Sequence, residues 1–188
     1  MNRWAIVAIP LMICLVLMEA VVTQFMADRV FCRAKVPIEE YERDYQLYSR
    51  GKRDCPAPIT SVGPLLKKAV KLEPHSAEYR HYLGRYYQNE ATEPHLSDTS
   101  RLRLARKATE EHEKSVKLDP LNGEYHAWLA YMQGVVGEHE KAAANFEKAI
   151  ELNSSNKWIQ QMYDFYRRSV PTPEEDEEDP EPSVSSGP

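Results

Sequence analysis

Hydrophobic residues follow three different patterns along this chain. Between positions 4 and 26 they form a nearly continuous apolar run, in which Glu19 is the single charged residue. Between positions 58 and 169 they recur every three or four residues, which is the period of an amphipathic helix. From Pro171 onward no apolar periodicity remains. We therefore expect an apolar helix, then an all-α domain, and finally a disordered tail at 170–188.

The apolar run predicts a transmembrane anchor at 4–26, preceded by a short N-terminal tail at 1–3. About twenty helical residues cross a hydrocarbon core of about 30 Å, and this run is long enough. A secretory signal peptide would instead end in two small residues separated by one position. Neither Ala20 nor Ala27 has a small residue two positions earlier, so we expect the anchor to stay uncleaved.

The charges beside the run point in two directions for the orientation of the anchor. Basic residues are more numerous after the run than before it, which favours a cytoplasmic domain. A very short tail carrying Arg3 before an apolar run is instead typical of a signal anchor, which exports the domain on its C-terminal side. Cys32 and Cys55 favour the same side, because they form a disulfide only in an oxidising compartment. We predict a single-pass protein of a bacterial inner membrane, with an extracytoplasmic domain.

Two features near the run have alternative interpretations. Glu19 is costly within a membrane, so it either contacts a partner helix or reaches the headgroups at the outer interface. Cys32 and Cys55 either form a disulfide or remain two free thiols, and their spacing fits no zinc pattern. Cys14 is most simply a small hydrophobic residue.

The stretch from 27 to 57 is predicted to contain a linker and an amphipathic helix. Ala27 to Val36 is the linker, Pro37 opens the helix, and Gly51 ends it. Four apolar and aromatic residues share one face of this helix. These are Ile38, Tyr41, Tyr45 and Tyr48. That face either packs on the following domain or lies on the headgroup layer.

Three segments of the central part share one pattern: 67–74, 113–120 and 147–154. The starts at 113 and 147 differ by 34 residues, whereas those at 67 and 113 differ by 46, one period plus twelve residues. The segments 79–87 and 125–133, upstream of the last two, also match each other. A period of 34 residues indicates a repeat of two helices.

These motifs resemble the tetratricopeptide-repeat (TPR) family over positions 58 to 169. The family's Leu-Gly-x-x-Tyr motif is present as Leu83, Gly84 and Tyr87, and the last repeat has further matching positions. The latter are Leu129, Gly137, Ala142, Phe146 and Ala149. The resemblance implies a helix-turn-helix solenoid of about two and a half repeats, closed by a capping helix at 157–169. The helix from Pro37 is a candidate partner for the incomplete first repeat.

The middle repeat departs from the family pattern. Its Phe-like position is His112 and its last small position is Ser115, which predicts looser packing. The twelve extra residues fall near 92–103, where Ser97 and Asp98 are strong N-cap types. We expect this insertion to lengthen the loop and extend the following helix. It is either a specific contact surface or a tolerated insertion.

The resemblance also implies a protein-binding groove lined by the first helix of each repeat. The candidate groove residues are His81, Arg85, Gln88, Tyr131, Trp158, Gln161, Phe165 and Arg168. The groove is a place for an extended peptide or a partner helix. Alternatively, Trp158 and Phe165 pack against the tail or the linker. The residue set with which some family members clamp a C-terminal carboxylate is not reproduced.

Charge and motif content exclude several other functions. The net charge is −5, but the acidic tail alone carries −7, so the rest carries +2 and shows no nucleic-acid-binding character. The tail either solvates the protein or meets a basic partner. Neither a Gly-rich phosphate loop nor HExxH or GxSxG is present, and the six histidines lack metal-ligand spacing. We therefore expect no enzyme, no cofactor and no metal site.

Together these patterns predict a membrane-anchored scaffold for protein–protein interactions. Its expected role is that of an accessory or assembly subunit of a membrane or envelope protein complex. The alternative is a membrane-tethered receptor that captures peptide or protein cargo transiently, with a cytosolic repeat domain.

Overall fold

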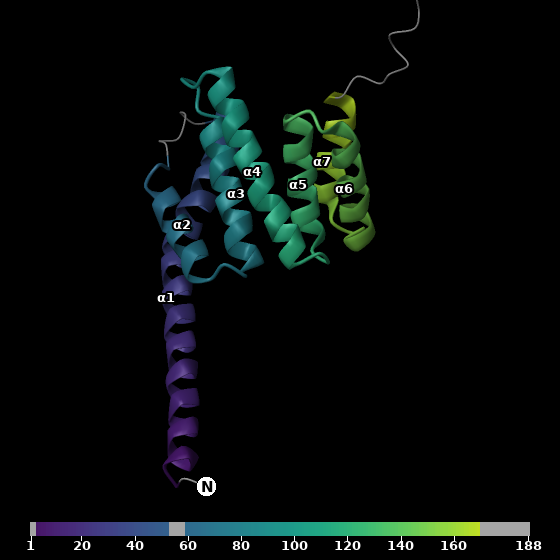
Figure 1. The fold of residues 1–188 in the computed structure, drawn as a ribbon. Helices are drawn as coiled ribbons and strands as arrows, with labels where there is room; N and C mark the ends of the chain where they lie inside the picture. The colour runs from purple at the N-terminus through teal and green to yellow at the C-terminus, as the bar shows by residue number, and fades with distance from the viewer. Residues whose placement is uncertain (1–2, 53–58, 170–188) are drawn as a thin grey trace, which may run out of the picture.

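The computed structural model describes residues 3–52 and 59–169, without the side chains of 3–8, 10, 11, 48 and 49. The described part confirms the predicted all-α class (Figure 1). It has seven helices: α1 (Arg3–Ser49), α2 (Val62–Leu72), α3 (Ala77–Ala91), α4 (Asp98–Leu118), α5 (Gly123–Val135), α6 (His139–Leu152) and α7 (Lys157–Ser169). Cys55 and the predicted acidic tail lie outside the described residues.

The helices form three consecutive pairs, α1 with α2, α3 with α4 and α5 with α6, followed by α7. The partners α3 and α4 are antiparallel, because Ser115 near the end of α4 donates a hydrogen bond of 3.0 Å to the carbonyl of Ala77 at the start of α3. Small residues with 0% exposure, including Ala108, Ala130 and Ala149, let the helices approach closely. This stacking of helix pairs is a TPR-like arrangement.

The second half of α1 is the first helix of the first pair, which completes the repeat for which only α2 was clear in the sequence. Asp28 contacts Tyr79 near the start of α3, whereas Glu42, farther along α1, contacts Arg85 farther along α3. The two helices are therefore parallel, as successive first helices of a repeat stack must be. Phe31 packs between them, with its ring centroid 4.4 Å from that of Tyr79.

We predicted a linker before Pro37, but the structure has a helix there. The helix α1 runs through this stretch without interruption and has 47 residues in all. Ala27, Phe31 and Ala34 are buried against α2 and α3, and this packing holds the segment helical. Pro37 lacks one backbone donor, a cost that the apolar contacts on either side offset. At Ile38 and Tyr41 the predicted face packs on the repeats, as the first of its two interpretations requires. The side chain of Tyr48 lies outside the described residues.

The predicted membrane location is wrong. Among the described residues, no helix is both long enough and apolar enough to cross a membrane. Although α1 has the length, Glu19 interrupts its apolar part, and charged residues begin again at Asp28 and Arg29. This finding contradicts the prediction of a single-pass protein of a bacterial inner membrane with an extracytoplasmic domain.

Two glycines with positive φ end helices in the same way. Gly51 has a φ of 67° and follows the end of α1, as predicted. Gly137 has a φ of 85° and follows the end of α5. After each glycine the next amide returns to the helix: Lys52 N–H donates to the carbonyl of Leu47 at 2.9 Å, and Glu138 N–H to that of Gln133 at 2.8 Å. Both ends are therefore Schellman caps.

We expect Gly137→Ala to lower the free energy of unfolding by about 1 kcal/mol, because a side chain is strained at positive φ. Asparagine tolerates this conformation better, so Gly137→Asn serves as the matched control and should cost less. Urea denaturation of the full chain followed by circular dichroism measures both. Equal losses for the two variants would contradict the cap as the cause.

Candidate functional site

The face between α1 and α3 is bridged by charged and polar pairs. The ammonium group of Lys35 lies 2.8 Å from the carboxylate of Glu78, and this hydrogen bond is the main cause that raises the pKa of Lys35. Glu42 accepts two hydrogen bonds from Arg85, one of them at 3.0 Å from Nε, and a third from Asn89 at 3.1 Å. The predicted groove residue Arg85 is therefore already engaged within the chain.

Aromatic rings surround the candidate groove residue His81, which is only 3% exposed. Its ring centroid lies 4.8 Å from that of Tyr125, 5.2 Å from that of His112 and 6.1 Å from that of Trp128. We call these four residues the histidine–aromatic cluster. It joins α3, α4 and α5, so His81 acts in packing between helix pairs and has little surface to offer a partner.

Both histidines of the cluster are held neutral by their surroundings. Burial, and then the positive charge of Arg85, lowers the pKa of His112 to about 3. Burial is also the main cause that lowers the pKa of His81 well below its ordinary value, with smaller contributions from His112, Arg85 and Lys35. Neither ring nitrogen of His112 has a hydrogen-bond partner, and Nδ1 of His81 also lacks one. Protonation would therefore place an uncompensated charge in the core.

Gly84 explains how the middle repeat accommodates a histidine at its Phe-like position. A Cβ atom at Gly84 would lie 2.7 Å from Nε2 of His112, so only glycine leaves room for the ring. His112 and Ser115 are both fully buried. The predicted looser packing of this repeat is therefore not visible at these two positions.

The last helix, α7, caps the repeats on one side and leaves aromatic side chains exposed on the other. Ile159 is fully buried, and the ring of Tyr163 stacks on that of Phe146 with 5.2 Å between centroids, which confirms the predicted capping role. Trp158 remains 37% exposed although its ring lies 5.3 Å from that of Trp128. Phe165 is 59% exposed. The candidate groove residues Gln161 and Arg168 are exposed on the same helix.

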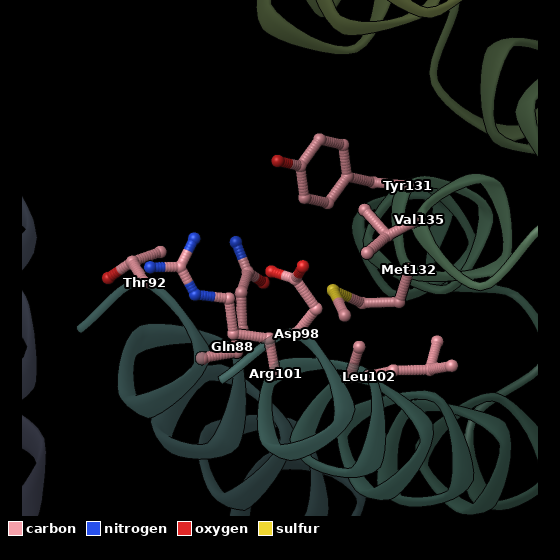
Figure 2. A pocket seen from close by; sticks show the side chains of 10 residues that line it. Gln88, Thr92, Asp98, Arg101, Leu102, Tyr131, Met132 and Val135 are labelled. Atoms are coloured by element: carbon pink, nitrogen blue, oxygen red, sulfur yellow. The ribbon is translucent and has the colours of Figure 1, made fainter. Parts of the chain in front are cut away.

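The remaining candidates, Gln88 and Tyr131, line a pocket of about 280 Å³ between α3, α4 and α5 (Figure 2). The predicted insertion supplies one wall, because the first turns of α4 contribute Asp98, Arg101 and Leu102. The end of α5 contributes Met132 and Val135. Burial raises the pKa of Tyr131, so its phenol stays protonated. Among the predicted groove residues, Gln88 and Tyr131 are the two that this pocket brings together.

Other predicted positions lie apart from this pocket. Glu19 is exposed on the first half of α1, and Cys32 is exposed on the same helix. Because Cys55 lies outside the described residues, the disulfide stays a prediction. Within the described ranges no group of three or more His, Cys, Asp or Glu side chains is placed to hold a metal ion.

Sequence reasoning missed Glu42, Leu102 and Met132. Glu42 is 43 residues from Arg85, and no local pattern indicates a pair over that separation. Met132 was part of a matched repeat segment, but its place beside the insertion depends on how far α4 extends. The twelve extra residues between the first two repeat segments were the one sequence feature that could have indicated Leu102. Extra residues before a helix form a surface that the other repeats lack.

We expect Glu42→Gln to lower the free energy of unfolding by about 2 kcal/mol, because it leaves Arg85 buried without its counter-charge. The side chain of Arg85 is 12% exposed, so water cannot fully replace the carboxylate. Adding Arg85→Met should recover part of the loss, as a double-mutant cycle by urea denaturation would show. The control is Glu151→Gln in the exposed pair with Lys148, which should change stability by less than about 0.5 kcal/mol.

The histidine–aromatic cluster predicts that the chain loses stability in acid. The folded pKa of His112 lies below its value of 6.5 in the unfolded chain, so unfolding takes up a proton. Stability is therefore complete above about pH 6.5 and falls as the pH drops toward 3, by about 1.4 kcal/mol per pH unit for each proton bound. His112→Phe should reduce this slope and preserve the packing, because Phe146 occupies the matching position of the next repeat.

Urea denaturation between pH 7 and pH 4 measures the slope. His112→Gln is the second variant, since it also removes the titrating group but keeps a polar side chain in the core. It should reduce the slope while lowering stability at pH 7, where the histidine of the original chain is neutral. A slope identical to that of the original chain in both variants would exclude His112 as its source.

No family model and no curated protein matches the chain. Among solved structures, the chain is similar to the TPR domain of OM64 from Arabidopsis, with 16% sequence identity and a TM-score of 0.48. The similarity covers 73% of this chain and 96% of that domain. The stacked helix pairs of this chain are themselves TPR-like in arrangement.

Proposed function

We propose that this chain is a non-catalytic scaffold for protein–protein interactions that acts as an accessory or assembly subunit of a multiprotein complex. The observation that carries the proposal is the first half of α1, which extends away from the repeats (Figure 1). Between Ile9 and Met26 it carries eleven large apolar side chains that are each between 43% and 68% exposed. Contiguous apolar surface of this kind marks an interaction site, because leaving it in water is unfavourable.

The apolar segment of α1 (residues 9–26) favours a permanent partner over a transient one. Obligate protein interfaces are more apolar than transient ones and resemble a core divided in two. Glu19 is the charged residue of the segment, and a partner that covers it must supply a hydrogen-bond donor or a positive charge. We therefore propose that Glu19 fixes the position of the partner along α1.

The second half of α1 couples this segment to the repeats. Phe31 and Ile38 are buried in the core that α1 forms with α2 and α3. A partner bound to residues 9–26 is therefore held at a fixed position relative to α3 and the following pairs. This connection is what a scaffold needs, because the repeats can then position a second protein.

A transient capture of peptide or protein cargo is the second candidate function. It is favoured by the exposed rings of Trp158 and Phe165 on α7, which offer anchors of the kind that partner-binding surfaces use. With Gln161 and Arg168 these residues form the proposed partner-binding surface of the last helix. Trp158→Ala/Phe165→Ala would weaken such capture and leave a partner of α1 bound.

Affinity purification of the full chain from its native cells, with quantitative mass spectrometry, tests the scaffold. We expect one partner in a constant molar ratio to the chain. Val21→Glu should abolish its recovery, because the substitution places a charge in the apolar segment. Leu121→Glu is the matched control, since Leu121 is 76% exposed in the loop between α4 and α5, and it should leave the partner bound.

Glu19→Leu separates polar recognition from apolar burial, because it makes the segment more apolar. We expect it to weaken recovery of the partner in the same purification. Unchanged recovery would show that Glu19 does not contribute to the interface. The proposed apolar contact of residues 9–26 would be unaffected by that result. If the original chain recovers no partner in a constant molar ratio, the proposed scaffold function is wrong.

A further inference from the structure

The pocket between α3, α4 and α5 has a construction that the other helix pairs do not share. Its wall comes from α4, which has 21 residues, whereas the equivalent helices α2 and α6 have 11 and 14. The first turns of α4 therefore reach beyond the standard pair and stand beside the end of α5. They contribute Asp98, Arg101 and Leu102 to the pocket.

This wall is held in place by its own hydrogen bonds. Ser97 caps α4 by accepting a hydrogen bond of 3.3 Å from the amide of Ser100. Nη2 of Arg101 donates to the backbone carbonyls of Glu93 and Pro94, at 3.4 Å and 3.2 Å. These bonds fasten the loop between α3 and α4 to the helix. The pocket is thus a built part of the fold, and a ligand would meet a preformed surface.

One side of the pocket is apolar and open. Leu102 is 39% exposed and Val135 is 52% exposed, while Met132 lies between them at 1% exposure and forms the floor. Figure 2 shows these three side chains together on one side, with polar groups on the other. Pockets for drug-sized molecules measure roughly 300–1,000 Å³, so the volume of about 280 Å³ suits a single large side chain better than a complete cofactor.

The polar side of the pocket includes two acceptors that have no partner within the described residues. Asp98 is exposed and forms no ion pair among the described residues. The side-chain oxygen of Gln88 is buried and also has no hydrogen-bond partner. Arg101 is the one cation of the lining, and although its Nε lacks a partner, its Nη2 is directed at loop carbonyls. A ligand that pairs with Asp98 therefore carries a donor or a positive charge next to its apolar group.

We propose that this pocket binds a polypeptide segment of a partner protein, in which a large apolar side chain enters between Leu102 and Val135 and an adjacent lysine or arginine meets Asp98. A polypeptide supplies the required combination, because its side chain fills the apolar side while its backbone N–H groups and basic neighbour face the acceptors. The inference rests on the proposed function as a protein-binding scaffold and specifies a second surface, separate from residues 9–26 of α1.

The test uses the full chain labelled with ¹³C at the methionine methyl groups, with the Met132 signal assigned through Met132→Leu. The probe is the acetylated hexapeptide amide Ser-Gly-Leu-Lys-Gly-Ser. Two matched peptides replace its leucine by serine or its lysine by glutamate. We expect saturable shifts of the Met132 signal with the first peptide, and binding about tenfold weaker with each of the other two.

Variants of the chain separate the pocket from non-specific contact. Val135→Glu should weaken binding of the Leu-Lys peptide by about tenfold or more, because it places a charge on the apolar wall. Leu121→Glu again serves as the matched control and should bind as the original chain does. Asp98→Lys should reverse the preference between the lysine and glutamate peptides. Circular dichroism of each variant confirms that it is folded.

Absence of a saturable Met132 shift with any peptide, in a folded chain, would overturn the proposal. The same affinity for all three peptides would overturn it as well, because the pocket would then select neither the apolar nor the basic group. These outcomes leave the scaffold function standing if a stoichiometric partner is still lost with Val21→Glu. If, by contrast, the original chain recovers no stoichiometric partner, the scaffold function on which the inference rests is wrong.

Discussion

The packing of α1 against α2 and α3 is the interaction on which the rest of the structure depends. A single helix pair cannot bury its apolar face alone, so each pair in a repeat stack needs its neighbours. Without α1, the buried faces of α2 and α3 that carry Leu66 and Tyr79 would be open to water. Because α1 supplies this cover with its second half, its first half is carried outward on the same rigid helix.

Charged groups take a large part in this packing. Glu39, Glu42 and Asp28 of α1 all accept hydrogen bonds from α3, and Tyr82 has its pKa raised to about 12, mainly by burial and then by its bond to Glu39. Such pairs contribute modestly to stability when exposed, but they define the register between two helices. The docking of α1 thus has one preferred position along α3. The orientation of the exposed apolar segment depends on that position.

Farther along the stack, the joints between pairs are made differently. Rings of the histidine–aromatic cluster join α3 and α4 to α5, and rings of Phe146, Tyr163 and Tyr166 join α6 to α7. At the first of these joints the core holds two neutral histidines, so its stability depends on pH. The extension of α4 then adds a polar and apolar pocket to the outer edge of that joint. The histidine–aromatic cluster and the proposed binding pocket are therefore both formed by α3, α4 and α5.

Elements that depend on local patterns could be predicted from the amino-acid sequence. The 34-residue period, the apolar spacing within α5 and α6, the Gly51 stop and the capping role of α7 all depend on residues close together in the chain. The sequence also located the insertion and two residues of the pocket, Gln88 and Tyr131. The pattern was misleading in two places. A polar run at 27–36 is compatible with either a linker or a helix, and an apolar run is compatible with either a membrane span or a protein-binding surface.

Which surfaces face each other depends on tertiary packing. Helical spacing placed His81 on the first helix of a repeat, but the rings of Tyr125 and Trp128 cover it because α5 packs there. The pair of Glu42 and Arg85 joins residues 43 positions apart, and such a contact exists only once α1 lies along α3. Local periodicity specifies which face of a helix is apolar, whereas the identity of the neighbour depends on the free energy of packing the whole stack.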